Sequence, residues 1–197
     1  IRLSLVGSEM CIRDRFDETA NRISNALINK GIRKGDKVIH LMMNCLEWLP
    51  AYFGILRTGA WAVPLNFRFS AEDIRYCAAI AEAKALIFGE EFVDRIDAIK
   101  EDLLTIHSFV FVGPEEVRPD YAEPLDAFIR NSPPHNPDIP MALLDNAALY
   151  FTSGTTGTPK PILLTHRNLE AACVVENRHH NQTHDDNFLC IPPLYHT

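Results

Sequence analysis

The sequence has 197 residues, of which 47% are hydrophobic and 23% are charged, a balance typical of a globular protein. Lys and Arg number 19 and Asp and Glu 26, so the formal net charge is −7, which argues against nucleic-acid binding because such proteins carry a basic surface. No apolar run approaches the roughly 18 residues that a membrane-spanning helix needs. The irregular cysteine spacing argues against a disulfide framework and favours a reduced, cytoplasmic protein; the five are Cys11, Cys45, Cys77, Cys173 and Cys190.

The first fifteen residues, IRLSLVGSEMCIRDR, differ from the rest of the chain. The apolar run is short, and Glu9 and Asp14 interrupt it, so it is a poor match to a signal peptide. SLVGSEMCIRDR resembles a translated sequencing-adapter sequence, and we interpret residues 1–15 as non-native. The alternative is a genuine but irregular N-terminal arm. An independently sequenced copy of the gene should lack the stretch.

From Phe16 onward, hydrophobic patterns predict alternating helices and strands. Gly31 is placed to end the first helix, and Ser70 with Asp73 has the spacing of a capping box at the start of another. The apolar runs between the helices are short and buried in character, as in parallel strands. The predicted helices cover residues 16–30, 45–59, 70–83, 90–104, a short piece near 125–131, and a last one from about 168; the predicted strands cover 37–43, 61–66, 84–89, 108–113, 146–151 and 162–166.

This alternation predicts an α/β layered fold with a largely parallel sheet and packed helices. Residues 114–141 contain seven prolines and read as an irregular connection. We therefore expect one partial domain over residues 16–197, with sub-sheets at about 16–113 and 142–197 joined by the proline-rich connection.

A Gly- and Thr-rich loop, TSGTTGTPK, follows the predicted strand NAALYF. Its glycines let the backbone turn and expose N–H groups, which can form an anion nest with the hydroxyls and the lysine. The spacing is neither G-x-x-x-x-G-K-[ST] nor G-x-G-x-x-G. A strand rather than a helix follows, so a phosphate would be held by loop amides, hydroxyls and Lys160, without a helix N-terminus. A flexible hairpin is the alternative.

The longer stretch YFTSGTTGTPKPILLTHRNL resembles the phosphate-binding signature of the adenylate-forming superfamily. GDKVIHLMMNCLEWLPAYFGILRTGAWAVPLNFRFSAEDIRY resembles the early N-terminal region of these enzymes, and PPLYHT the motif that lines their acyl site. One departure is Pro161, where the family usually has glycine. The resemblance implies that Tyr195 and His196 line the acyl pocket, with His196 beside the reacting carboxylate, and that the nucleotide-binding residues are Thr152, Ser153, Gly154, Thr155, Thr156, Gly157, Thr158, Pro159 and Lys160.

The resemblance is greatest to acyl-CoA synthetases, and it implies an N-terminal fragment of an ATP-dependent carboxylate–CoA ligase. Such an enzyme activates a fatty or other acyl acid with ATP and Mg²⁺, and passes it to CoA. The motifs for adenine, ribose and Mg²⁺ lie beyond Thr197 in relatives, so we expect this chain alone to be inactive. Two alternatives are an amino-acid adenylation domain of a peptide synthetase, which a carrier domain downstream would favour, and a non-catalytic nucleotide-binding protein.

Two histidine features have simpler interpretations than metal binding or catalysis. The NRHHNQTHDD stretch could bring His180 and His184 onto one helix face, but a helix end followed by a solvated loop explains it. His40 lies in an apolar strand and is interpreted as a hydrogen-bonded core residue. The sequence therefore predicts no resident metal site.

Overall fold

The computed structural model describes residues 2–152, 158–183, 185–186 and 192–195. Its centre is a seven-stranded sheet with the order β5-β4-β3-β1-β2-β6-β7. Neighbouring strands are parallel except for the last pair, β6 and β7, which form an antiparallel hairpin. The strands are β1 (Lys37–Leu41), β2 (Trp61–Pro64), β3 (Ala85–Gly89), β4 (Ser108–Val112), β5 (Glu123–Pro124), β6 (Asn146–Thr152) and β7 (Lys160–Thr165).

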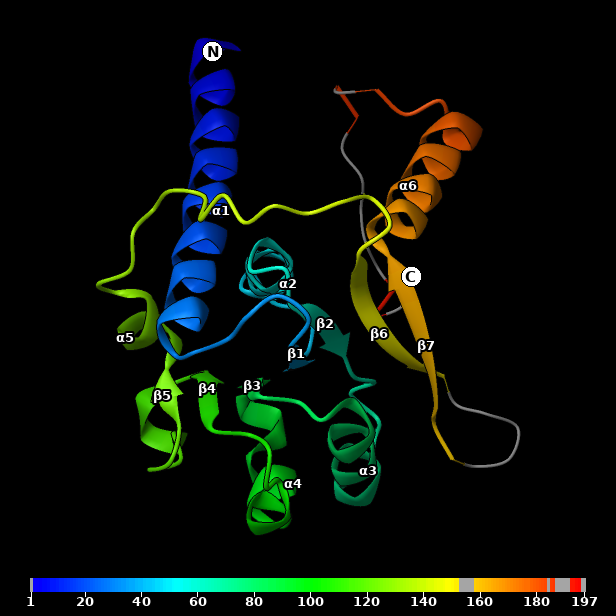
Figure 1. The fold of residues 1–197 in the computed structure, drawn as a ribbon. Coiled ribbons are helices and arrows are strands. Elements are labelled where there is room, and N and C mark those ends of the chain that lie inside the picture. The colour runs from blue at the N-terminus through cyan, green and yellow to red at the C-terminus, as the bar shows by residue number, and fades with distance from the viewer. Residues whose placement is uncertain (1, 153–157, 184, 187–191, 196–197) are drawn as a thin grey trace.

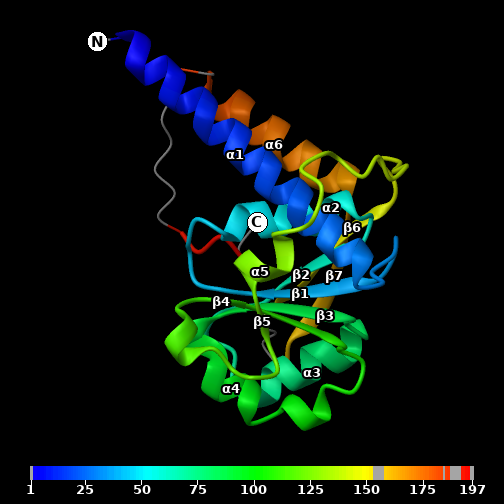
Figure 2. The same cartoon turned by 90° about the vertical axis from the view of Figure 1, so that its left-hand side faces the viewer.

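Helices cover both faces of the sheet (Figures 1 and 2). One face carries α1 (Arg2–Asn29), α2 (Trp48–Arg57) and α5 (Leu125–Ile129), and the other carries α3 (Ala71–Ala81) and α4 (Val93–Asp97). The last helix, α6 (His166–His180), follows β7 and has no buried residue. This layered arrangement confirms the predicted α/β class with a largely parallel sheet.

The core is divided by the sheet into two clusters, as the alternation of β1 shows. Val38 faces the cluster under α1 and α2, and Ile39 and Leu41 face the cluster under α3 and α4. All three side chains are fully buried. Because both faces are covered, the strand reads as a continuous apolar run, which is why the sequence predicts it.

The expected division into two sub-sheets differs from the structure, in which both ranges contribute to one sheet. Strand β6 pairs in parallel with β2 through Ala62 and Ala148. The proline-rich connection therefore returns the chain to the same sheet.

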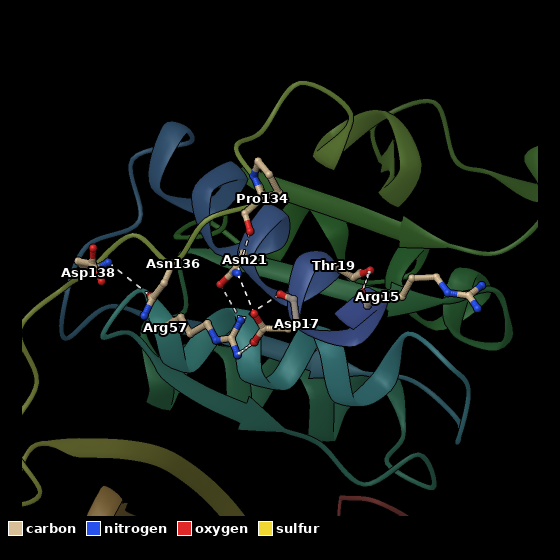
Figure 3. A network of polar contacts seen from close by, with 8 residues as sticks. All are labelled: Arg15, Asp17, Thr19, Asn21, Arg57, Pro134, Asn136 and Asp138. Atoms are coloured by element: carbon tan, nitrogen blue, oxygen red, sulfur yellow. Dashed lines mark hydrogen bonds and ion pairs between the residues drawn. The ribbon is translucent and has the colours of Figure 1, made fainter. Parts of the chain in front are cut away.

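The proline-rich connection is tied to α1 by hydrogen bonds to its carbonyl groups. Proline has no N–H, so its main chain can only accept. The Asn21 amide donates to Pro134 O at 2.8 Å, and Asn25 donates to Pro133 O at 3.0 Å. Asn21 in turn accepts from Arg57 of α2 at 2.6 Å (Figure 3). These contacts explain why an irregular segment follows a defined path.

The predicted capping box is confirmed at the start of α3. The Ser70 hydroxyl accepts from Asp73 N–H at 3.2 Å, and the Asp73 carboxylate accepts from Ser70 N–H at 3.0 Å. These bonds satisfy two main-chain donors that the helix itself leaves unpaired.

Two predicted helices differ from the structure. Helix α1 begins at Arg2 rather than near Phe16, so residues 2–15 continue it; the interpretation of residues 1–15 as non-native stays a prediction. The single helix expected over 90–104 is instead a 3₁₀ turn (Glu90–Phe92), the short α4, and a second 3₁₀ turn (Lys100–Asp102). The chain leaves helical geometry at Ile99, with φ −125° and ψ −1°, and Leu103 is buried beyond it.

A third 3₁₀ turn (Glu115–Val117) follows β4.

Among the described residues, no helix is long and apolar enough to cross a membrane.

Candidate functional site

The described residues of the site predicted from sequence lie at one edge of the sheet. Strands β1, β2 and β6 are parallel, so the segments that follow them emerge at the same edge, here called the carboxyl edge. Ligands of open α/β sheets bind outside the carboxyl ends of strands. Asn44 follows β1, Phe67 follows β2, and the Gly- and Thr-rich loop follows β6.

The described part of this loop is the mouth of the β6–β7 hairpin. Thr152 and Lys160 are register partners on the two strands, so their main chains lie side by side where the loop begins and ends. Thr152, Thr158 and Lys160 are exposed and Pro159 is buried. Ser153, Gly154, Thr155, Thr156 and Gly157 lie outside the described residues.

The element after the loop is strand β7, as predicted, and α6 begins only at His166. The loop therefore does not open a helix, and a bound anion would depend on loop amides, hydroxyls and Lys160. Within the described ranges Lys160 has no ion-pair partner, so its charge is available to a ligand.

Pro161 is accommodated in the edge strand of the sheet, where proline is tolerated. It is paired with Phe151, and the register runs without interruption from Thr152 and Lys160 to Leu149 and Leu163. The shift in register falls at the far end of the hairpin, near Asn146. The base of the loop thus keeps its strand pairing with proline at this position.

Tyr195, predicted to line the acyl pocket, lies beside Phe67. The ring centroids are 5.3 Å apart in an edge-to-face arrangement, and Tyr195 is buried. It belongs to the core cluster that also contains Tyr52 and Tyr150. His196, predicted to stand beside the reacting carboxylate, lies outside the described residues.

An aromatic cluster lies on the α2 face of the sheet, where α2 meets the end of β6. The Trp48 and Tyr52 rings stack at 5.4 Å, and the Tyr52 hydroxyl is 3.1 Å from that of Tyr150, two residues before Thr152. Burial raises the pKa of Tyr52 well above its usual value, and the hydrogen bond with Tyr150 adds to the effect. The Tyr52 hydroxyl thus stays protonated at neutral pH.

His40 of β1 is part of this cluster, with its ring 4.3 Å from that of Trp48. It is 1% exposed, and neither ring nitrogen has a hydrogen-bond partner among the described residues. Burial lowers its pKa from 6.5 to about 3, so the ring is neutral at pH 7. The core placement is confirmed, but the expected hydrogen bond is absent from the described part of the chain.

A cavity of about 370 Å³ opens at the carboxyl ends of β1, β3, β4 and β5. No sequence motif indicates this cavity, although the shared edge of parallel strands is a signal for it. Four carboxylates in its lining would repel a polyphosphate, which argues against this cavity as the phosphate site. They are Glu47, Glu90, Glu91 and Asp126.

The histidine-rich stretch forms no metal site in the described residues. His180 lies 3.3 Å from Glu176 on the last turns of α6, and His184 is outside the described ranges. Across those ranges, no three His, Cys, Asp or Glu residues come together in a way that could hold a metal ion.

Comparison with known proteins agrees with the geometry. The family model for AMP-binding enzymes matches residues 14–197. A crotonobetaine/carnitine–CoA ligase of a Proteus species is 29% identical over 185 residues, covering 92% of this chain and 36% of that protein. A long-chain-fatty-acid–CoA ligase of Mycobacterium tuberculosis, FadD13, is 30% identical over 184 residues, covering 92% and 35%.

Solved structures give the same result. The inhibitor-bound N-terminal domain of FACL13 from Mycobacterium tuberculosis superposes with a TM-score of 0.79 at 28% identity, covering 92% of this chain and 44% of that one. The anthranilate CoA ligase AuaEII in complex with anthranoyl-AMP has a TM-score of 0.74 at 30% identity, covering 77% and 29%.

This chain belongs to the AMP-binding enzyme family, and the relatives named here are acyl-CoA ligases. It spans about a third of the length of the curated relatives it matches.

Proposed function

We propose that this chain is the phosphate-binding and acyl-pocket part of an ATP-dependent carboxylate–CoA ligase. The observation that carries the proposal is the strand–loop–strand hairpin with Thr152 and Lys160 paired at its mouth, at the carboxyl edge of the sheet. Membership of the AMP-binding family and the acyl-CoA ligase names of its relatives support the same activity. The substrate is a carboxylic acid of the fatty or another acyl class.

In the proposed reaction, a carboxylate oxygen attacks the α-phosphorus of ATP and the bond between the α-phosphorus and its bridging oxygen breaks. The products are an acyl-adenylate and pyrophosphate, and the CoA thiol then takes the acyl group and releases AMP. Negative charge builds on the leaving pyrophosphate oxygens. Donors already arranged around them lower the barrier, because they need no reorganisation during the reaction.

The proposed role of residues 152–160 is to hold the β- and γ-phosphates. Thr152 and Thr158 present exposed hydroxyls, and Lys160 presents an unpaired ammonium among the described residues. An ammonium on a phosphate forms a charge-assisted hydrogen bond, about twice as strong as a neutral one. Ser153, Gly154, Thr155, Thr156 and Gly157 belong to the same proposed cradle, whose glycines would let the backbone amides approach the phosphates.

Tyr195 and His196 are proposed to line the acyl pocket, with His196 beside the carboxylate. The support is the burial of Tyr195 against Phe67 at the carboxyl edge. Mg²⁺ would neutralise phosphate charge in such a reaction. The described residues offer no set of metal ligands, so its ligands would come from the phosphates of ATP and from residues outside those described.

Replacing Lys160 with glutamine is expected to weaken binding of tripolyphosphate to the 197-residue chain about tenfold. The substitution keeps a polar side chain of similar length and removes one charge-assisted contact, worth about 1.4 kcal/mol. Isothermal titration calorimetry at low salt measures the change. Lys84→Gln is the matched control, because Lys84 precedes β3 at the opposite edge of the sheet. Equal affinities of the two variants for tripolyphosphate would show that Lys160 does not bind the phosphates.

The 197-residue chain by itself is expected to show no carboxylate-dependent ATP–pyrophosphate exchange. Relatives are about three times as long, and the described residues supply phosphate donors without metal ligands. The assay follows radiolabelled pyrophosphate incorporated into ATP, with a panel of short- and long-chain carboxylic acids. A full-length acyl-CoA ligase is the positive control. Exchange above background with the wild-type chain would show that the chain is catalytically sufficient.

A further inference from the structure

The Asn44 side chain joins two parts of the carboxyl edge that are 148 to 150 residues apart in sequence. Its Nδ2 donates to Pro192 O at 3.1 Å, and its Oδ1 accepts from Leu194 N–H at 2.9 Å. Both distances are those of ordinary hydrogen bonds. One amide thus holds two points of the main chain of residues 192–194.

The sequence of this segment explains why an amide is needed. Pro192 and Pro193 have no N–H, so Leu194 carries the first main-chain donor after residue 191. The carbonyl of Pro192 can pair with a donor and the N–H of Leu194 with an acceptor, and Asn44 supplies both. Asn is the shortest side chain that supplies both from one planar group.

Tyr195 comes directly after the segment that Asn44 holds. Its ring packs edge-to-face on Phe67, which follows β2, and is buried. Asn44 itself follows β1, the neighbour of β2 in the sheet. Attachment at two points fixes both the position and the direction of the backbone that leads into Tyr195, so the ring meets Phe67 in one orientation.

We propose that Asn44 is a positioning residue, which fixes residues 192–194 so that Tyr195 closes against Phe67 at the acyl pocket. This inference rests on the proposed function, in which Tyr195 shapes that pocket. In this role Asn44 acts through the main chain of residues 192–194. Its loss should therefore affect how the acid binds more than how ATP binds.

The first test is structural and independent of activity. In the 197-residue chain, nuclear Overhauser effects between the Tyr195 and Phe67 rings are measured for the wild type and for Asn44→Ala, Asn44→Asp and Asn131→Ala. Asn131 is exposed and follows α5, away from residues 192–195 in the sequence, which makes it the matched control. We expect Asn44→Ala to lose the contact and to shift the Leu194 amide resonance, and Asn131→Ala to keep both.

The aspartate variant separates the two hydrogen bonds. It keeps an acceptor for Leu194 N–H but places a carboxylate against the Pro192 carbonyl, so an intermediate loss of the ring contact is expected. An unchanged Phe67–Tyr195 contact in Asn44→Ala, with amide dispersion showing an intact fold, would overturn the proposal.

The second test is kinetic and uses the full-length ligase. Asn44→Ala is expected to raise the KM for the carboxylic acid about tenfold, corresponding to two lost hydrogen bonds of ordinary strength, while the KM for ATP stays the same. Equal effects on both KM values, or none, would contradict a positioning role at the acyl pocket. A full-length protein with no ligase activity would refute the proposed function, and the ring contact would still decide whether Asn44 positions Tyr195.

Discussion

His40→Leu is expected to make the folded chain more resistant to acid. The His40 ring is buried against Trp48, and burial lowers its pKa from 6.5 to about 3. Between these values the unfolded chain binds a proton that the folded chain does not, so stability falls as the pH falls. At pH 4 this difference in proton binding lowers the free energy of unfolding of the wild type by roughly 3 kcal/mol. Leucine, which cannot be protonated, removes this cost.

Near pH 7 the same substitution is expected to change stability much less. Two unpartnered ring nitrogens cost about 1–3 kcal/mol each when they are buried without hydrogen bonds, and their removal favours leucine. The lost ring contact with Trp48 offsets part of that gain, since aromatic pairs contribute about 0.5–1.5 kcal/mol. The diagnostic quantity is therefore the difference between the pH dependences, rather than either stability alone.

Urea unfolding of the wild type and of His40→Leu from pH 7.5 to pH 4 measures this difference. His107 is exposed and provides the control; His107→Leu should follow the wild-type curve. Parallel curves for the wild type and His40→Leu would show that a partner or water satisfies His40 in solution.

The elements of the fold that were predicted correctly are those set by local chemistry. The buried run around Val38 and Ile39 is a strand because both faces of a parallel sheet exclude water. Ser70 and Asp73 mark a helix start because they pair with each other's main chain. The hairpin before and after residues 153–159 follows from apolar runs on both sides of a Gly- and Thr-rich loop.

The elements that were predicted wrongly depend on contacts between distant parts of the chain. Residues 90–104 have helical spacing, yet the chain turns at Ile99 so that Leu103 also reaches the core. The order of strands places β6 beside β2 through Ala62 and Ala148, far apart in sequence. No local pattern contains that pairing, so one sheet was interpreted as two.

The candidate site also has one part that the sequence predicts and another that only the folded structure shows. The loop that ends at Lys160 and the tyrosine at 195 are visible in sequence, because their motifs are continuous. The bridge from Asn44 to Leu194 joins two loops through one amide, and only the folded chain brings them together. The unpartnered nitrogens of His40 likewise depend on packing. A histidine in a buried strand usually has a hydrogen-bond partner, and the sequence does not show that His40 has none among the described residues.

A single added methyl group at Gly54 is expected to destabilise the fold, because the obstacles include backbone and Cβ atoms of the neighbouring helix. It lies in α2, where the helix packs against α1. A Cβ at this position would lie 2.8 Å from Ile23 Cγ2, 2.9 Å from Ile23 Cβ and 3.0 Å from Ala20 O. These distances are too short for carbon contacts, so one helix would have to move.

Gly54→Ala should therefore destabilise the fold, although alanine is normally preferred to glycine inside a helix by about 1 kcal/mol. Overpacking in a well-packed core costs about 1–3 kcal/mol, and we expect a decrease of this size in the free energy of unfolding, with a larger one for Gly54→Leu. Thermal and urea unfolding measure it. Leu49→Ala, at an exposed site of the same helix, should change stability by much less.

The pair Ile23→Ala and Gly54→Ala tests the cause. Ile23→Ala removes Cγ2, the nearest obstacle, and leaves Ile23 Cβ and Ala20 O in place, so it relieves part of the clash, and the double variant should be more stable than the sum of the single effects predicts. Strictly additive effects would exclude this contact as the reason. Helix α2 also carries Trp48 and Tyr52. A displaced α2 should therefore change the near-ultraviolet circular dichroism of the aromatic cluster, and so link the packing at Gly54 to the face of the sheet that supports Tyr150 and the loop after it.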